Sequence, residues 1–316
     1  MKGVRPAATI AVVGSANQDY IVRVVSAPAP GETVLASSML TQPGGKGANQ
    51  AVAAARLGAT VSFIGAVGND TDGASLLRGL VAERVDTTNV EVLNRGRTGL
   101  ALVSVFDTGE NSVTVVPGTN FAVSTKRVSR AIQRIAKESE KLLMVVQGEL
   151  RPEVIDAAVR ATAKSGGRCI VNLAPYQPLS PDVLALCDPL ILNQSEASSL
   201  VGWAVDDVRA AARAAGEIAM AVKSVVITIG AEGAYWADSG GAGHVAAPIV
   251  TDVVDTLGAG DALVGALAAE LAHGSRLKRA VEVGVLAGSF AVRRSGAQSS
   301  YAARTDLDLD RTNSSA

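Results

Sequence analysis

Short apolar runs rich in β-branched residues recur along this chain and alternate with alanine-rich segments. The runs occupy residues 9–13, 60–64, 142–146, 169–173, 190–192 and 224–229. Their continuous apolar character is typical of strands that are buried on both faces. The alanine-rich segments have helical character and cover residues 48–57, 73–83, 126–137, 152–164 and 206–221. This alternation predicts an α/β fold with a doubly wound, mostly parallel sheet flanked by helices on both faces.

Two regions depart from this alternation, at about residues 19–42 and 98–116, and both have the pattern of hairpin strands. We expect them to form a small antiparallel sheet that stands off the main domain as a lid. An exposed sheet of this kind usually needs a cover, such as a ligand site or a second subunit. We therefore predict one domain over residues 1–301, followed by a polar tail, 302–316, that is disordered.

Composition excludes several classes of function. The chain has 29 Lys+Arg against 30 Asp+Glu, a balance that predicts no nucleic-acid partner. Cys169 and Cys187 give neither a disulfide framework nor a metal-ligand spacing. His244 and His273 lie far apart in the sequence, which argues against a zinc site or a Ser-His-Asp triad. The first apolar run is short and predicts a strand rather than a signal peptide, and no stretch is long enough to cross a bilayer. We therefore expect a cytoplasmic protein without a membrane partner.

The segment DTLGAGDALVGAL, residues 255–267, carries the strongest chemical signal. Gly258 and Gly260 allow a tight turn before an apolar helix that begins near Asp261. The start of such a helix offers unpaired N–H groups and a partial positive charge, which suit a transferring phosphoryl group. A carboxylate at this position is able to accept a proton from an attacking hydroxyl. The residues alone leave a plain helix cap equally open as the role of Asp261.

A second glycine-rich segment, GGKGANQA, covers residues 44–51 and also precedes a helix. Its Lys46 and Asn49 are natural partners for sugar hydroxyls, which both donate and accept hydrogen bonds. A flexible loop with a helix cap is the alternative. Neither segment is a Walker A loop, and the first strand is not followed by the glycine fingerprint of dinucleotide-binding domains.

Together the two segments resemble the two signatures of the ribokinase-like (pfkB) family of sugar and nucleoside kinases, and the resemblance extends over nearly the whole chain. It implies a doubly wound domain with a small β-sheet lid that is often shared across a homodimer. It also implies an ATP-dependent phosphotransferase with an alcohol acceptor, using Mg²⁺ and activated by K⁺. Ala48-Asn49-Gln50 favours D-ribose, phosphorylated at O5 to ribose 5-phosphate for pentose phosphate metabolism.

The resemblance also assigns roles to matching positions. Asp261 would be the catalytic base, and the backbone of Gly258, Ala259 and Gly260 would form the anion hole. The residues implied to bind the sugar, together with Asp261, are Asn17, Asp19, Gly45, Lys46, Gly47, Ala48, Asn49 and Glu149. The residues implied to bind ATP and Mg²⁺ are Asn193, Glu196, Thr228, Ile229, Gly230, Ala231, Glu232, Gly233, Gly260 and Val285. The implied K⁺ ligands are Asp255, Leu257, Ala291, Arg294, Gly296 and Ser300.

One position departs from the family pattern. Members often place a polar or ring side chain near the adenine, and this chain has Val285 there, which makes the pocket more apolar. The alternatives that stay open are a deoxyribose or nucleoside kinase of the same fold and a sugar-binding regulator without catalysis. The presence of Asp261, Gly258 and Gly260 argues against such a regulator.

Overall fold

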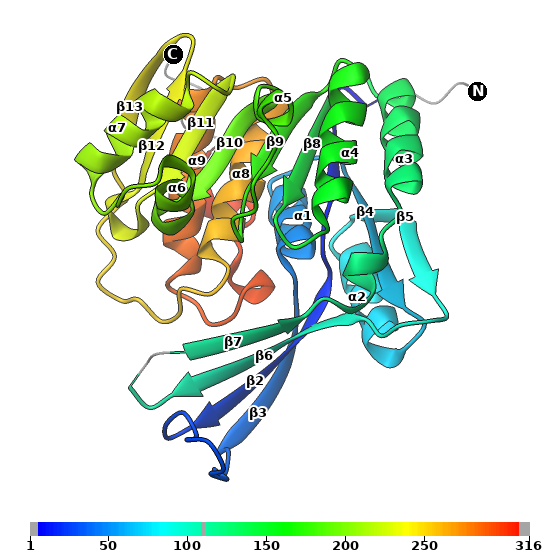
Figure 1. Cartoon of the computed structure of the whole chain (residues 1–316), viewed down its shortest axis with the longest axis vertical. Coiled ribbons are helices and arrows are strands. Elements are labelled where there is room, and N and C mark those ends of the chain that lie inside the picture. Colours follow the sequence, from blue (N-terminus) through cyan, green and yellow to red (C-terminus); the bar gives the residue numbers. More distant parts are fainter. Residues whose placement is uncertain (1–5, 109–110, 310–316) are drawn as a thin grey trace.

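A nine-stranded sheet runs through the centre of the protein in the order β13-β12-β11-β10-β9-β8-β1-β4-β5 (Figure 1). The structure is a computed structural model and describes residues 6–108 and 111–309. The strands from β11 to β5 are all parallel, and β12 and β13 add an antiparallel edge. The strands of this sheet are β1 (Thr9–Val13), β4 (Val61–Gly68), β5 (Asp86–Leu93), β8 (Leu142–Gln147), β9 (Arg168–Asn172), β10 (Cys187–Asn193), β11 (Ser224–Thr228), β12 (Ala234–Asp238) and β13 (Gly241–Val245).

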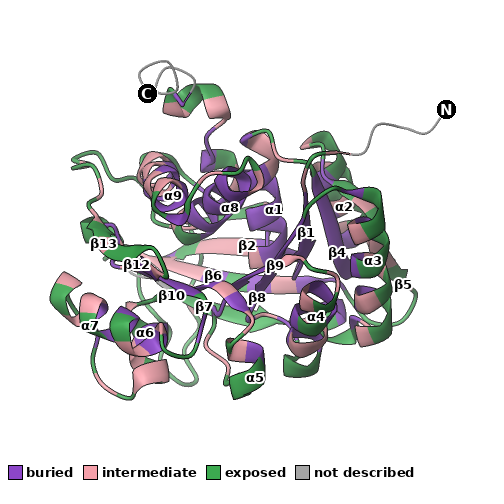
Figure 2. Cartoon of the chain, turned by 90° about the horizontal axis from the view of Figure 1, so that it is seen from above, coloured by how far each residue is buried: buried purple, intermediate pink, exposed green. Residues whose placement is uncertain are grey.

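Helices cover both faces of this sheet, and the central strands between them are buried (Figure 2). One face packs against α1 (Lys46–Arg56), α2 (Thr71–Ala82), α8 (Ala259–Ala272) and α9 (Leu277–Ala291). The other face packs against α3 (Thr125–Glu138), α4 (Pro152–Lys164), α5 (Pro181–Leu184), α6 (Gln194–Val201) and α7 (Val208–Ile218). The predicted doubly wound architecture is therefore confirmed.

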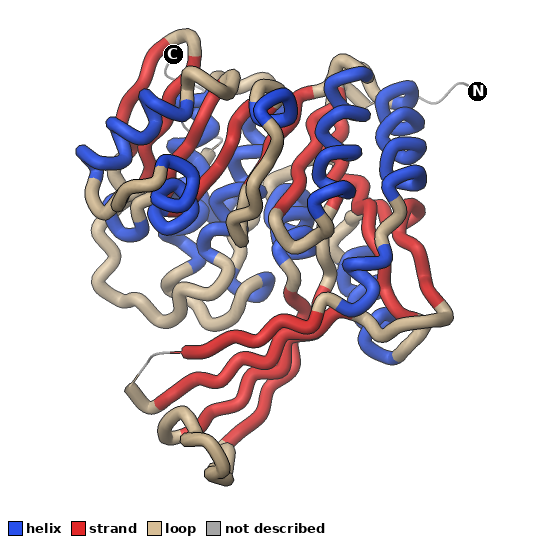
Figure 3. The backbone as a smooth tube through the Cα atoms, in the orientation of Figure 1, coloured by secondary structure: helices blue, strands red, loops and turns tan. Residues whose placement is uncertain are grey.

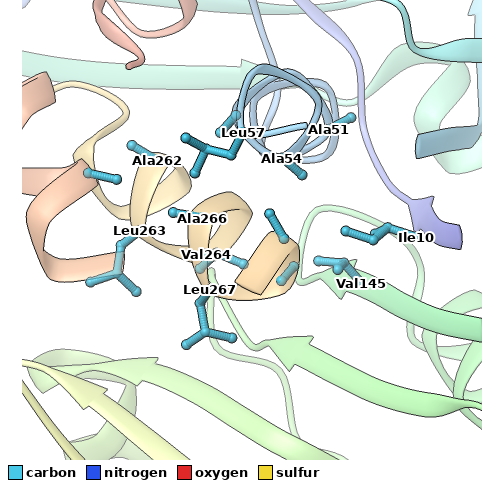
Figure 4. Packing of buried hydrophobic residues seen from close by; sticks show 14 of the residues in the cluster. Ile10, Ala51, Ala54, Leu57, Val145, Ala262, Leu263, Val264, Ala266 and Leu267 are labelled. Atoms are coloured by element: carbon cyan, nitrogen blue, oxygen red, sulfur yellow. The ribbon is translucent and has the colours of Figure 1, made fainter. Parts of the chain in front are cut away.

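Helices α1 and α8 pack closely, and this contact positions the two glycine-led helix starts side by side. A Cβ atom on Gly265 of α8 would lie only 2.5 Å from the Cβ of Ala53 and 2.7 Å from the carbonyl oxygen of Gln50, both on α1. Alanine residues complete the contact, as Ala54, Ala262 and Ala266 show in Figure 4. Glycine and alanine thus bring the two backbones together at a distance that larger side chains would prevent.

A separate four-stranded sheet stands away from the helices, as the strands drawn below the domain in Figure 3 show. Its order is β3-β2-β6-β7, with β2 (Asn17–Val24), β3 (Ser38–Gly44), β6 (Gly99–Phe106) and β7 (Asn111–Val116). Both expected hairpins are present as antiparallel pairs. The two hairpins join through β2 and β6, which are parallel because both strands leave the main domain in the same direction. The hairpin pattern in the sequence did not predict this parallel junction.

Some elements differ from the sequence expectation. Strands β5, β12 and β13 and helix α9 were not predicted. Strands β5 and β13 lack a continuous apolar run, because β5 is largely exposed and β13 is rich in glycine. Short 3-10 turns occur at η1 (Gly118–Ala122), η2 (Gly230–Glu232), η3 (Gln298–Ser300) and η4 (Arg304–Leu307). Residues 302–309, which we expected to be disordered, contain η4 and end with a buried Leu309. The rest of the predicted tail, 310–316, lies outside the described residues.

Candidate active site

Asp261 lies in the first turn of α8, and its side chain is buried. The helix follows Gly258, which has a left-handed backbone with a φ of 74°. A Cβ atom on Gly258 would lie 2.7 Å from the hydroxyl of Tyr301 and 2.8 Å from the Cβ of Ala297, so the turn needs glycine for both conformation and space. The first-turn N–H groups of a helix have no intrahelical partners and carry a partial positive charge. The carboxylate of Asp261 therefore lies at a position suited to an anion.

Side-chain amides from α1 hold this carboxylate on both oxygens. Asn49 donates from Nδ2 to Oδ2 of Asp261 at 3.0 Å, and Gln50 donates from Nε2 to Oδ1 at 2.9 Å. The predicted neighbours Asn49 and Asp261, which are 212 positions apart in the sequence, are thus in direct contact. This contact is the one on which the kinase hypothesis depends.

The lid supplies a second carboxylate to the same place. Asp19 on β2 is buried, and the pKa of its side chain is raised from 3.8 to about 7, first by burial and then by the charges of Glu149 and Asp261. Its Oδ1 atom has no hydrogen-bond partner among the described residues. A buried acceptor without a partner is costly, and a ligand hydroxyl would satisfy it.

Lys46 and Glu149 lie beside this pair of carboxylates. The charge of Asp261 is the largest cause that raises the pKa of Lys46, and the charge of Glu149 adds to it. The backbone N–H of Lys46 donates to Oε2 of Glu149 at 3.0 Å, and the hydroxyl of Ser15 donates to the same oxygen. These contacts tie the start of α1 to the ends of β1 and β8, at the carboxyl edge of the sheet where ligands of such folds bind.

The remaining residues predicted for the sugar site have mixed surroundings. Asn17 lies in this group, and its Oδ1 accepts from Nδ2 of Asn120 at 2.8 Å. Gly45 has a φ of 85° and caps α1. Gly47 and Ala48 are buried against the end of β1, where the N–H of Ala48 donates to the carbonyl oxygen of Ser15 at 2.9 Å. Their surroundings are those of backbone-positioning residues.

A cavity of about 510 Å³ opens on the other side of the α8 N-terminus. Six of the residues predicted to bind the nucleotide line it: Thr228, Gly230, Ala231, Gly233, Gly260 and Val285. Ala259 also lines it, whereas Gly258 faces Tyr301 instead. The only polar side chains in the lining belong to Thr228, Thr256 and Ser289, so the cavity fits a flat, largely apolar group such as the nucleobase of a nucleotide.

Four other residues predicted for the nucleotide do not line this cavity. The side chain of Ile229 is buried in the core, and Glu232 is exposed beside it. Asn193 and Glu196 form a reciprocal capping box at the start of α6, with hydrogen bonds of 2.8 and 2.7 Å. Burial raises the pKa of Glu196, and the charge of Asp261 also raises it, which indicates that the two carboxylates lie near each other.

Apart from Ala291, which ends α9, the residues predicted to bind K⁺ lie in two segments, one on each side of α8 and α9, that Asp255 joins. Its carboxylate accepts from the N–H of Leu257 at 2.9 Å and from the N–H of Gly296 at 2.9 Å. Ser300 is buried and donates to the carbonyl oxygen of Ala297, while Arg294 stacks on Phe290 at 3.6 Å and bonds the Phe290 carbonyl. Ala291 is buried at the end of α9, with its carbonyl oxygen accepting from the N–H of Arg294. Among the described residues, no group of three or more His, Cys, Asp or Glu side chains is placed to hold a metal ion.

Sequence reasoning missed several residues of the site. Gln147 and Asn172 end neighbouring strands and bond to Gln50, and Gln298 donates to Oδ1 of Asn49 at 3.0 Å. The loop between β13 and α8 lines the cavity with Pro248, Ile249, Val250 and Val253. The only sequence signal for the strand-end residues was the position of a polar side chain after a buried apolar run.

The fold and this site define the class of a carbohydrate kinase: a doubly wound domain, a β-sheet lid, and a buried carboxylate between a polar cluster and an apolar cavity. Comparisons with known proteins agree. The chain belongs to the pfkB carbohydrate kinase family, whose sequence pattern matches residues 7–304. No helix in the described part of the chain is long and apolar enough to cross a membrane.

Individual relatives with known functions include ribokinases and deoxyribokinases. The chain is 35% identical over 310 residues to a ribokinase of Schizosaccharomyces pombe, covering 95% of this chain and 96% of the relative. It is 34% identical over 296 residues to a deoxyribokinase of Salmonella typhi, and this match covers 92% of this chain and 95% of the relative. Its structure is similar to that of Arabidopsis thaliana ribokinase complexed with ribose and ATP, with a TM-score of 0.85 and 27% sequence identity. The match covers 96% of this chain and 98% of the Arabidopsis chain.

Proposed function

We propose that this enzyme transfers the γ-phosphoryl group of ATP to O5 of D-ribose, with Asp261 as the general base. The product, ribose 5-phosphate, would enter pentose phosphate metabolism. The observation that carries this proposal is the position of Asp261, whose carboxylate contacts Asn49 while its neighbour Gly260 lines the apolar cavity. A single side chain thus lies between the proposed sugar site and the proposed nucleotide site.

The sugar site is supported by polar groups that a polyol would satisfy. Asp19 offers a buried oxygen that has no hydrogen-bond partner in the described part of the chain, and Lys46, Asn17 and Asn49 supply further polar groups to the same site. A ribose hydroxyl is able to donate to a carboxylate and to accept from an amide or ammonium group at the same time. The cluster therefore matches the chemistry of a small sugar better than that of an apolar substrate.

The reaction asks mainly for positioning and charge stabilisation. Asp261 accepts the proton of the attacking hydroxyl as the new P–O bond forms. The backbone of Gly258, Ala259 and Gly260 would form the anion hole for the developing negative charge at the start of α8. Thr228, Gly230 and Gly233 line the cavity into which the base of the nucleotide would enter.

Replacing the base tests this assignment. Asp261→Ala is expected to lower kcat by at least about 10²-fold, because general-base catalysis typically contributes 10²–10⁴-fold. Ribose binding, measured by calorimetry, should persist, because Asp19, Lys46 and Asn49 remain. The exposed Asp206→Asn is the control and should keep full activity in an ADP-release assay. Activity of Asp261→Ala within about tenfold of wild type would contradict the base assignment.

A deoxyribose kinase is the second candidate, because deoxyribokinases match this chain at 34% identity. The two sugars differ by one hydroxyl, and a site built to bind that hydroxyl rejects the analogue lacking it by as much as about 10⁴-fold. Comparing kcat/KM for ribose, 2-deoxyribose and a panel of nucleosides would decide between them. Ribose as the weaker substrate would overturn the proposed specificity.

We also propose Mg²⁺ and K⁺ as cofactors. Asn193 and Glu196 would hold Mg²⁺ and the phosphates, and Mg²⁺ would neutralise phosphate charge. The K⁺ site would use oxygens from the loops around Asp255 and Ser300, and the bonds from Leu257 and Gly296 to Asp255 support it by holding these loops together. Rates in K⁺ and in Na⁺ at equal ionic strength test it, and equal rates would count against these ligands.

A homodimer through the lid is the last part of the proposal. The lid exposes Met39, Leu40, Leu102, Val113 and Val115, with 43–66% of each side chain accessible. The strand register places Leu40, Val113 and Val115 on the face of the lid that carries Asp19, and Met39 and Leu102 on the opposite face. An exposed apolar face of a small sheet is typical of a surface that a second copy covers. Sedimentation equilibrium of the wild type and of Leu40→Lys tests this, and a monomeric wild type would refute it.

We place the enzyme in the cytoplasm, where ATP is available, and cell fractionation tests that location.

A further inference from the structure

Three uncharged amide side chains are buried behind Asp261, where apolar residues would be expected. Gln50, Gln147 and Asn172 are only 1%, 1% and 7% exposed. They come from the first turns of α1 and from the ends of β8 and β9, which are adjacent strands with Gln147 paired to Asn172. Burying a polar group is costly unless it is hydrogen-bonded, so such a cluster needs a compensating function.

The amides of Gln50 and Asn172 are bonded at both ends, so their neighbours fix their directions, whereas Oε1 of Gln147 has no hydrogen-bond partner among the described residues. Nε2 of Gln147 donates to Oε1 of Gln50 at 2.7 Å. Nε2 of Gln50 then donates one hydrogen to Oδ1 of Asn172 and the other to Oδ1 of Asp261, both at 2.9 Å. Asn172 in turn donates from Nδ2 to the carbonyl oxygen of Ile191 at 3.3 Å. A backbone carbonyl cannot reverse its role, so it sets the direction of the bonds that lead to it.

This arrangement prevents the amide of Gln50 from turning over. A turned amide would place its oxygen against the oxygens of Asn172 and Asp261 and its NH₂ group against the NH₂ group of Gln147. Two acceptor pairs and one donor pair would then be left unsatisfied in a buried site, and each such loss is expensive. Gln50 is therefore able to face Asp261 only as a donor.

We propose that Gln50 is a positioning residue that holds the carboxylate of Asp261 in the orientation needed for proton transfer. With Asn49 bonded to Oδ2, the two oxygens are held by successive residues of one helix, and the carboxylate plane is fixed. This inference rests on the proposed role of Asp261 as base. It gives a physical role to a glutamine that would not touch the substrate.

Kinetics separate this role from a structural one. Gln50→Met keeps the length of the side chain and removes the donor. It is expected to lower kcat by about 10–100-fold with the ribose KM changed by less than about threefold, because small misplacements of a catalytic group cost up to about 10² in rate. In the Asp261→Ala background the same substitution should change the residual rate by less than about twofold. An unchanged kcat, or an equal loss in both backgrounds, would overturn the proposal.

One control variant and one second test variant complete the experiment. Ser139→Ala removes a buried hydrogen bond to Thr9 at the opposite end of β1 and should leave kcat unchanged. Gln147→Met frees the oxygen of Gln50, so a smaller loss of about threefold to tenfold is expected, again absent in the Asp261→Ala background. This variant decides the matter if Gln50→Met does not fold, and a kcat equal to that of wild type would refute the fixed direction.

A stability measurement keeps this proposal distinguishable from the proposed function. A wild type without ribose turnover would refute the substrate, not the hydrogen bond. In urea unfolding, the loss of stability caused by Gln50→Met should then fall by at least half when Asp261→Ala is already present. Equal losses in the two backgrounds would show that Gln50 does not hold Asp261.

Discussion

Asp19 is predicted to make the ligand-free enzyme less stable as the pH rises. Its pKa is raised from 3.8 to about 7, mainly by burial, so the native state binds a proton that the unfolded chain releases near pH 4. The free energy of unfolding must then fall as the pH rises from about 4 to about 7, and it levels off above that. Asn at this position has no charge to bury, so Asp19→Asn should remove this dependence.

The size of the effect follows from the shift. One pKa unit corresponds to about 1.4 kcal/mol, so the three-unit shift costs about 4 kcal/mol at pH 8. At pH 5 only about 1.5 kcal/mol of this cost is present, because that pH lies just over one unit above the unfolded pKa. The stability of Asp19→Asn relative to wild type should therefore increase by about 2–3 kcal/mol between pH 5 and pH 8.

Urea unfolding at pH 5, 6, 7 and 8 without ligand measures this difference, since titrating groups that do not interact with Asp19 cancel between the two proteins. Asp206→Asn, at an exposed position, is the matched control and should follow the wild type at every pH. Parallel curves for wild type and Asp19→Asn would refute the reasoning. Saturating ribose should flatten the wild-type curve if a sugar hydroxyl donates to the unpartnered Oδ1 of Asp19.

Further predictions concern three other positions. Gly265→Ala should destabilise the protein by about 1–3 kcal/mol in urea unfolding, because its Cβ would lie 2.5 Å from that of Ala53. Unchanged stability would mean that α1 and α8 are not closely packed. Gly260→Ala meets no atom within 4 Å, so it should keep its stability but raise the KM for ATP by entering the cavity. Interactions with His273, Ser275 and Arg304 lower the pKa of Glu270 from 4.5 to about 2, and they outweigh burial, which raises it. Glu270→Gln should therefore lose roughly 2–3 kcal/mol at pH 7, a difference that shrinks as the pH falls from about 4.5 to about 2.

The sequence predicted the main sheet well because its central strands are buried on both faces. The runs at 9–13 and 142–146 lie within β1 and β8. Exposed strands were harder to predict from the sequence. In β5 and β13 the apolar residues are interrupted by polar or glycine residues, so neither strand has a continuous apolar run. The hairpins of the lid were predicted from turns and alternation, but the parallel pairing of β2 with β6 depends on where both strands leave the domain.

The candidate site shows a similar division. Glycine-led helix starts are local features, so Asp261 and Asn49 were found from their own segments and then proved to be in contact. Gln147 and Asn172 gave only a weak local signal, because a polar residue at the end of a strand is common in any α/β fold, and Gln298 in η3 gave none. Their relation to the site exists only after distant segments have packed together.

That packing depends on the small residues between α1 and α8. Gly265 lies one turn after Asp261, and its missing side chain lets the backbone of Gln50 approach within the space that a Cβ would occupy. A larger residue there would push the helices apart and lengthen the 2.9 Å bond from Gln50 to Asp261. A hydrogen bond weakens steeply as its length and angle depart from the ideal. A packing change that lowers the free energy of unfolding only modestly would therefore leave the carboxylate of Asp261 without a fixed orientation. The glycine of the helix contact and the amides of the site therefore belong to one arrangement, in which close backbone packing sets the geometry of the proposed base, Asp261.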